Sequence, residues 1–230
     1  MNILSIETAT EHGSVALLHD GELLVRRIEG AANHSEAVLR DLRELLIEAG
    51  LAVTQLDAIA FGAGPGAFTG LRLACGVAQG LALGAGLGIA AIGSLQALAL
   101  QTDARRVFVA TDARMGEVYH AAFELDAEGV PMPVGQVGCS QPLELELPAG
   151  DWFAAGSAFN VWPQELEARL LGRLTGCRPD MVPRAEEVAR LGAVAVARGA
   201  LTPPELAAPL YVRDKVAFTT AERLARGGRA

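Results

Sequence analysis

Lysine is almost absent from this chain, because only Lys215 among its 19 basic residues is a lysine. A P-loop needs a lysine directly before Ser or Thr, so that the ammonium group reaches the bound phosphates. The glycine-rich turn at 62–66 is followed instead by Ala67 and Phe68 before Thr69. The sequence therefore excludes a P-loop nucleotide site at this turn.

Cysteine is scarce as well. Cys75, Cys139 and Cys177 are widely spaced and form no Cys-x-x-Cys pair. This pattern excludes a thiol–disulfide motif and a zinc ribbon, and an odd number is atypical of a secreted disulfide framework. The first residues also lack the basic segment of a signal peptide. These absences predict a cytoplasmic protein.

Positive charge is in short supply: 19 basic against 27 acidic side chains give a net charge of −8. A free-standing nucleic-acid-binding protein needs a basic face to displace counterions, so this class is disfavoured. The tail differs, because residues 211–230 carry five basic and two acidic side chains. That local positive charge would suit binding to RNA or to an acidic partner. The alternative is that it belongs to the solvated end of a helix.

Charge of either sign is missing between Arg72 and Asp103, a stretch long enough to cross a bilayer. Six glycines interrupt this stretch, and residues 87–92 are typical of a strand between two buried helices. We therefore predict no transmembrane span.

The turn at 62–66 is the most informative feature that is present. It separates an apolar run at 58–61, typical of a buried strand, from a helix that is expected to begin near Ala67. Glycines let the backbone take positive φ and let a ligand or another segment approach. The free N–H groups of the helix start favour an anion, or a capping oxygen such as that of Thr69. A tight turn without a ligand explains the same residues.

Hydrophobic periodicity predicts an α/β protein with two similar halves. In the first half, strands are expected at 2–8, 13–19, 22–28, 57–62 and 87–92, and helices at 34–49, 67–85 and 94–101. Asn33 is expected to cap the first helix and Gly50 to end it. In the second half, strands are expected at 107–111, 117–125 and 152–156, and helices at 163–172 and 184–199.

Five segments carry a family resemblance in the same order along the chain. They are ILSIETATEHGSVAL at 3–17, NHSE at 33–36, GPGAFTGLR at 64–72, DARMGEVY at 112–119 and PLYVR at 209–213. Together they resemble the TsaB (YeaZ) family, the companion subunit in tRNA threonylcarbamoyladenosine synthesis. Five ordered matches over most of the chain are far more specific than any one of them.

The resemblance implies the actin/Hsp70/sugar-kinase (ASKHA) architecture, an α/β fold of two RNase H-like lobes. The first lobe is expected at 1–100 and the second at 101–215. A C-terminal helix at 216–228 is expected to pack back on the first lobe.

The resemblance also implies a non-catalytic subunit that binds and activates the sister protein TsaD. The ATPase TsaE is expected to bind across this pair, and tRNA is expected to contact the chain only indirectly, through the complex. Alone, the chain is expected to form a homodimer. The implied interface lies on the first and second long helices, at His34, Leu39, Leu42, Leu46, Arg72, Leu73, Val77 and Leu81. Nucleotide or partner contacts are expected at Glu7, Thr8, Gly64, Pro65, Gly66, Thr69, Asp112, Arg114 and Glu117.

Three glycines, Gly76, Gly80 and Gly84, share one face of the second long helix. They allow another backbone to come close, either that of a partner or that of the chain's own sheet. At the DARMGE turn, Asp112 or Glu117 is expected to hold Arg114, which then grips a partner or serves a structural ion pair.

A metal site is not expected. TsaD carries two histidines four residues apart on its first long helix, a spacing that lets both bind one metal. Here His34 is followed at that spacing by Val38, and His12, His19 and His120 lack ligand spacing. The chain is therefore expected to have no metal or cofactor of its own, with any ATP or ADP lying at the complex interface.

The competing hypothesis is a stand-alone ATPase or small-molecule kinase of the same architecture. Such an enzyme needs a carboxylate near Mg²⁺, and Glu7 is the candidate. A third option is a homodimeric scaffold that binds no nucleotide.

Overall fold

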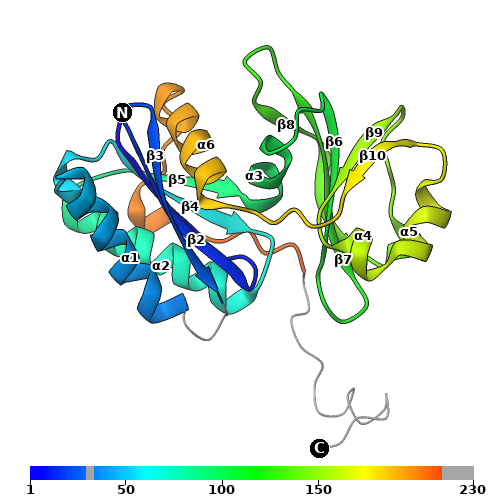
Figure 1. Ribbon diagram of the computed structural model, residues 1–230, viewed down its shortest axis with the longest axis horizontal. Helices are drawn as coiled ribbons and strands as arrows, with labels where there is room; N and C mark the ends of the chain where they lie inside the picture. Colours follow the sequence, from blue (N-terminus) through cyan, green and yellow to red (C-terminus); the bar gives the residue numbers. More distant parts are fainter. Residues whose placement is uncertain (30–33, 214–230) are drawn as a thin grey trace, which may run out of the picture.

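The computed structural model describes residues 1–29 and 34–213. Two lobes, each built on one five-stranded sheet, lie side by side with helix α3 (Ser94–Leu100) between them (Figure 1). The predicted cap Asn33 and the predicted helix at 216–228 fall outside the described residues.

The first sheet has the order β3-β2-β1-β4-β5. Its strands are β1 (Ile3–Glu7), β2 (His12–His19), β3 (Glu22–Glu29), β4 (Ala58–Gly64) and β5 (Ile89–Gly93). The first three strands run antiparallel as a meander, whereas β4 and β5 join β1 in parallel. β1 and β4 are buried along their whole length, as expected of central strands covered on both faces.

Helices cover both faces of the first sheet. Helices α1 (His34–Ala49) and α2 (Phe68–Ala85) pack on one face, around Leu42, Leu45 and Phe61. Helix α6 (Ala185–Ala197) packs on the other face with Val188 and Leu191. Two short 3₁₀ turns, η2 (Val53–Gln55) and η4 (Pro204–Leu206), complete the first lobe.

The second sheet repeats the same connectivity, with the order β10-β9-β6-β7-β8. Its strands are β6 (Arg106–Asp112), β7 (Val118–Leu125), β8 (Pro131–Ser140), β9 (Trp152–Ala155) and β10 (Leu174–Arg178). The pairs β6–β7 and β7–β8 are antiparallel, and β6–β9 and β9–β10 are parallel. The predicted α/β fold of two RNase H-like lobes is confirmed by this duplicated topology.

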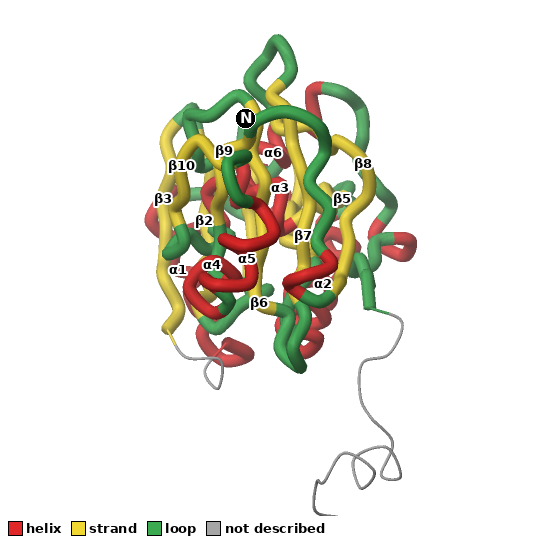
Figure 2. The backbone as a smooth tube through the Cα atoms, turned by 90° about the vertical axis from the view of Figure 1, so that its right-hand side faces the viewer, coloured by secondary structure: helices red, strands yellow, loops and turns green. Residues whose placement is uncertain are grey.

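One face of the second sheet packs on α3, and the other carries α4 (Ala158–Val161), α5 (Pro163–Leu170) and the 3₁₀ turn η3 (Pro142–Glu144). Figure 2 looks at the molecule from this side, with α4 and α5 nearest the viewer. Trp152 is fully buried beneath them.

The predicted lobe boundaries need one correction. The second lobe is expected to extend to residue 215, but the chain returns to the first sheet at α6, where Val188 and Leu191 pack beside Ile3 and Ala60. The first sheet has two apolar faces, and α1 and α2 cover only one of them. A helix from a distant part of the chain therefore covers the other.

Helix α2 is long and apolar enough to cross a membrane by length and composition, and no other helix of 1–29 and 34–213 meets that test. It packs on β4 and buries Leu71, Ala74, Ala78 and Ala82. Its apolar composition is thus used in the core of the first lobe.

Candidate functional site

A cleft of about 1580 Å³ opens between the lobes. Six of the nine predicted nucleotide or partner contacts line it: Thr8, Pro65, Gly66, Thr69, Asp112 and Arg114. The first lobe contributes the turn after β1 and the start of α2, and the second contributes the turn after β6 and the loop before α6. Glu7, Gly64 and Glu117 do not line it.

Gly66 of the 62–66 turn and Gly70 of α2 serve the packing of α2 within the chain. A Cβ at Gly66 would overlap Ala9, and a Cβ at Gly70 would overlap the carbonyl oxygen of Thr8. The Ala67 N–H donates to the Ala9 oxygen at 2.7 Å, and Thr8 Oγ1 donates to the Gly70 oxygen at 2.8 Å. Close approach of two segments therefore requires both glycines without any ligand.

The start of α2 differs from the expectation that Thr69 caps it. Ala67 is the N-cap residue, and no side chain makes a capping hydrogen bond there. Thr69 instead lines the cleft.

Glu7 lies at the end of β1, sealed beneath the cleft and only 1 % exposed. Its carboxylate accepts the Ala9 N–H at 2.6 Å and the Ser94 hydroxyl at 2.8 Å. Burial raises the pKa of Glu7 from 4.5 to about 7, against the opposing effect of these hydrogen bonds. A Cβ at Gly62 would overlap the carboxylate, so this glycine makes room for it.

In this structure Glu7 therefore offers no exposed surface to a nucleotide or partner, and its contact with either stays a prediction. The sequence singled out Glu7 as the candidate Mg²⁺ carboxylate of a stand-alone ATPase or kinase. The structure instead directs the side chain between β1, β4 and the first residue of α3, where protein atoms surround it.

The turn after β6 places Arg114 at the edge of the cleft. Both Arg114 and Met115 have positive φ, at 62° and 58°, an unusual conformation for residues with side chains. Arg114 Nη1 lies 3.2 Å from Asp112 Oδ2, and its Nη2 lies 3.6 Å from Glu11 Oε2 on the first lobe. The prediction that Asp112 holds Arg114 is confirmed, and the Arg114 side chain stays 74 % exposed.

Glu117 holds a different arginine. Arg213 lies 2.5 Å from the Glu117 carboxylate and donates to the Ala113 carbonyl oxygen at 3.0 Å. Sequence reasoning missed this residue. The signal was available, because Arg213 ends the PLYVR segment that carries part of the family resemblance.

Arg72 belongs to a second cluster that the sequence did not predict. Its guanidinium carbon lies 3.4 Å from the centre of the Phe68 ring, and its Nε donates to the Tyr211 hydroxyl at 3.1 Å. The two rings lie 5.8 Å apart. Phe68 is 38 % exposed and Tyr211 48 % exposed, so the cluster presents arginine and aromatic atoms to solvent beside the cleft. Such residues are enriched at protein–protein interfaces.

The outer face of α1 and α2 is the other candidate surface. Leu39 and Ile47 on α1 and Leu83 on α2 are exposed to solvent. The α2 glycines Gly76, Gly80 and Gly84 are exposed too, and a Cβ added at any of them would meet nothing within 4 Å. The alternative that these three glycines pack α2 on its own sheet is therefore excluded.

Two predicted interface residues lie elsewhere. Leu42 and Leu46 are buried between α1 and the first sheet, because they belong to the apolar stripe that anchors the helix. Leu73, Val77 and Leu81 are half-buried along the edge of the same core. His34 is the first residue of α1, and its side chain lies outside the described part of the structure.

Within 1–29 and 34–213, no group of three or more His, Cys, Asp or Glu residues is arranged to hold a metal ion. The cleft is lined by threonine, serine, arginine and carboxylate side chains together with apolar ones such as Phe68, Leu73 and Met115. This set suits hydrogen bonding to a ligand or a partner.

Comparison with known proteins places the whole chain. Residues 29–219 match the family model described as TsaD, tRNA N6-adenosine threonylcarbamoyltransferase. The chain is 34 % identical to the tRNA threonylcarbamoyladenosine biosynthesis protein TsaB of Escherichia coli K12, over 95 % of this chain and 97 % of that protein. It is 43 % identical to TsaB of Haemophilus influenzae over about half of each protein.

Solved structures agree with this placement. YeaZ from Pseudomonas aeruginosa matches with a TM-score of 0.83 and 37 % identity, covering 91 % of this chain and 99 % of that one. The near-complete coverage in both directions means that the two share both lobes. The chain belongs to the TsaB (YeaZ) family.

Proposed function

We propose that this chain is a non-catalytic subunit of the bacterial tRNA N6-threonylcarbamoyladenosine synthesis complex. It binds and activates TsaD, which transfers the threonylcarbamoyl group to the adenosine next to the anticodon. The near-complete match to TsaB of Escherichia coli supports the pathway. The open face of α1 and α2 supports a role in binding a partner, and this observation carries the proposal.

TsaD is proposed to dock on the outer face of α1 and α2. Exposed glycines within a helix weaken it by about 1 kcal/mol each relative to alanine. Gly76, Gly80 and Gly84 have free space around them, so packing inside the chain does not explain them. They let a partner helix approach the α2 backbone, and the exposed Leu83 on α2 and Leu39 on α1 supply apolar contacts. The same face is proposed to join two copies of the chain when TsaD is absent.

A non-catalytic role is supported by two buried positions. Glu7, the candidate Mg²⁺ carboxylate of an ATPase, is sealed by protein atoms. Val38, at the helix position where TsaD has its second histidine, is fully buried in the core. We therefore expect TsaD to carry the chemistry, TsaE to supply ATP hydrolysis, and any ATP or ADP to lie where the subunits meet. Contact with tRNA is expected only through the complex.

The test is a reconstituted threonylcarbamoylation reaction with tRNA, threonine, bicarbonate, ATP, the adenylate-forming enzyme, TsaD and TsaE. Modified tRNA is measured with the chain present, with the chain omitted, and with TsaD omitted. Product is expected only when both the chain and TsaD are present. Equal product without the chain would contradict the proposal. Mg²⁺-dependent ATP turnover by the pure chain would favour the stand-alone ATPase instead.

The proposed interface is tested by Leu39→Asp combined with Leu83→Asp. Each introduces a charge at a position that is 54 % and 73 % exposed, respectively, so folding is expected to be unaffected. Affinity for TsaD, measured by isothermal titration calorimetry, is expected to fall roughly tenfold or more, about 1.4 kcal/mol. Leu171→Asp, at a 75 % exposed position of the second lobe, is the matched control.

Unchanged affinity of the double variant would place the interface elsewhere. A variant at Leu42 is unsuitable for this test, since its side chain is only 2 % exposed and a charge there would disrupt the core.

A further inference from the structure

Within residues 1–29 and 34–213 the chain passes between the lobes three times. It crosses from α3 to β6, from β10 to α6, and again after η4. Helix α3 itself belongs to both cores: Ala97 packs with the first lobe, and Leu95 and Leu98 pack with the second. Two further sets of contacts tie the lobes together on either side of this helix.

The first set involves the β7–β8 turn, residues 126–130, which reaches over to α6 of the first lobe. Val130 is only 7 % exposed and packs with Val188 and Leu191 of α6. Arg198, directly after α6, lies 2.9 Å from Asp126 and also pairs with Glu128. The turn thus contributes a buried apolar side chain and two ion pairs to the neighbouring lobe.

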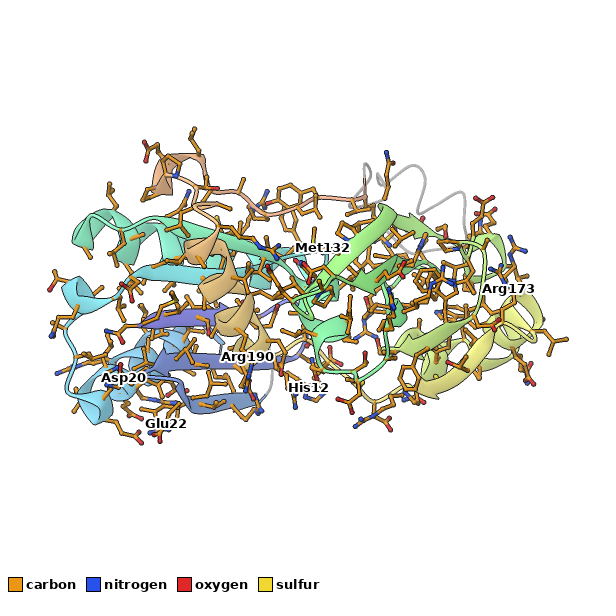
Figure 3. The ribbon with its side chains drawn as sticks, turned by 90° about the horizontal axis from the view of Figure 1, so that it is seen from above. His12, Asp20, Glu22, Met132, Arg173 and Arg190 are labelled. Carbon is orange, nitrogen blue, oxygen red and sulfur yellow. The ribbon has the colours of Figure 1, made fainter. Side chains whose placement is uncertain are left out.

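Two further observations fix the position of this turn. Gln96 of α3 donates to the Pro131 carbonyl oxygen at 2.9 Å. Asp126 accepts the N–H groups of Glu128 and Val130, each at 2.9 Å. Figure 3 labels Met132, the second residue of β8, close to the junction between the lobes.

The second set involves residues 207–213, here called the strap. The strap begins on the first lobe, where Gln79 donates to the Ala207 oxygen at 3.0 Å and the Leu210 N–H donates to the Ala63 oxygen at 2.7 Å. It ends on the second lobe, where Arg213 is bound by Glu117 and the Ala113 carbonyl. In Figure 1 the strap runs below α3 and the β7–β8 turn lies above it.

We propose that the strap and the β7–β8 turn clasp the two lobes on opposite sides of α3 and hold the cleft at one fixed opening. Two-lobed proteins that close on a ligand rotate about a few hinge residues. Here a hinge at the chain crossings would have to break contacts on one side of α3 whichever way the lobes rotated. The chain therefore moves as one body and presents α2 and the Arg114 turn at a constant separation.

Pulsed electron–electron spin resonance tests this directly. Spin labels on Glu22→Cys, at the far end of the first lobe, and Leu171→Cys, on the second, report the separation of the lobes in the full chain. Cys139 and Cys177 are replaced by serine, and Cys75 is buried. The expected result is one narrow distance distribution that Mg·ATP does not change. A broad distribution, or a shift with Mg·ATP, would overturn the proposal.

A second spin-label experiment removes the ionic contacts of both the β7–β8 turn and the strap. The double variant Arg198→Gln, Arg213→Gln is expected to broaden the distance distribution. Arg198→Gln removes the ion pairs of the β7–β8 turn, and Arg213→Gln removes the ion pair of the strap. Arg26→Gln, which breaks the Arg26–Glu48 ion pair within the first lobe, is the matched control and is expected to leave it narrow. A distance distribution that stays narrow in the double variant would show that the β7–β8 turn and the strap do not fix the opening of the cleft.

Hydrogen exchange on the unmodified chain keeps the proposal testable if the double variant does not fold. The amides of Val130 and Leu210, which donate to Asp126 and Ala63, are expected to exchange as slowly as amides of the central strands. Exchange as fast as that of an exposed loop would overturn the proposal.

Discussion

Replacing Gly70 by alanine is expected to destabilise the chain by about 3 kcal/mol, the upper part of the range for overpacked positions. The added methyl group would overlap the carbonyl oxygen of Thr8, which is backbone and has no rotamer to change. Helix α2 would have to move away from the turn after β1. This would also strain the hydrogen bond from Thr8 Oγ1 to the Gly70 oxygen, 2.8 Å in the native chain. The measurement is urea unfolding monitored by circular dichroism.

Gly76→Ala on the same helix is the matched control. Its added methyl group meets nothing within 4 Å, so only the gain in helix propensity remains. Alanine is favoured over glycine in a helix by about 1 kcal/mol, and Gly76→Ala is expected to raise the free energy of unfolding by that amount. Two identical substitutions six residues apart should therefore have opposite signs. Equal effects would contradict the described packing of α2.

The free energy of unfolding is expected to fall as the pH rises from 4.5 to 7, because of Glu7. The pKa of Glu7 rises from 4.5 to about 7 on folding, so the folded chain binds this proton more tightly than the unfolded chain. The stabilisation is complete below pH 4.5, where both states are protonated, and it is lost as pH rises through 7. A shift of this size corresponds to about 3 kcal/mol.

Glu7→Gln is expected to remove this pH dependence, since glutamine is neutral throughout and can still accept the Ala9 N–H. Urea unfolding at pH 5 and pH 8 compares the two proteins. The variant should gain on the wild type at pH 8 and differ little at pH 5. Glu11→Gln, at a carboxylate that is 58 % exposed, is the control. If the free energy of unfolding changed with pH by the same amount in the wild type and in Glu7→Gln, Glu7 would not be buried as described.

Most elements follow from local sequence, but two strands and one lobe assignment do not. The central strands and long helices carry strong apolar periodicity, which local sequence reveals. Strand β8 contains Pro131, Pro133 and Gly135, which favour a loop, and it forms a strand because β7 pairs with it. Strand β10 is short and lies at the opposite edge. The place of α6 on the first sheet depends on which face is left open, and periodicity does not encode this.

The site was predictable to the extent that motifs mark it. The glycine turn and the DARMGE turn, both singled out from the sequence, line the cleft. Helical spacing alone does not separate the apolar residues that anchor α1, such as Leu42, from those that face solvent, such as Leu39. The partners of Glu7 and Glu117 were also hidden, because Ser94 and Arg213 lie 87 and 96 positions further along the chain.

The open edge at β8 has a consequence for assembly. Prolines in sheets lie where a missing N–H faces away from the neighbouring strand, so Pro131 and Pro133 remove donors from the outward row of this edge. The register shift between His120 and Ala122 further distorts the pairing of β7 with β8. An incoming strand would find an irregular template, which opposes ladder-type aggregation of copies crowded in solution. Contacts through helices are then the less hindered route by which this chain joins other proteins.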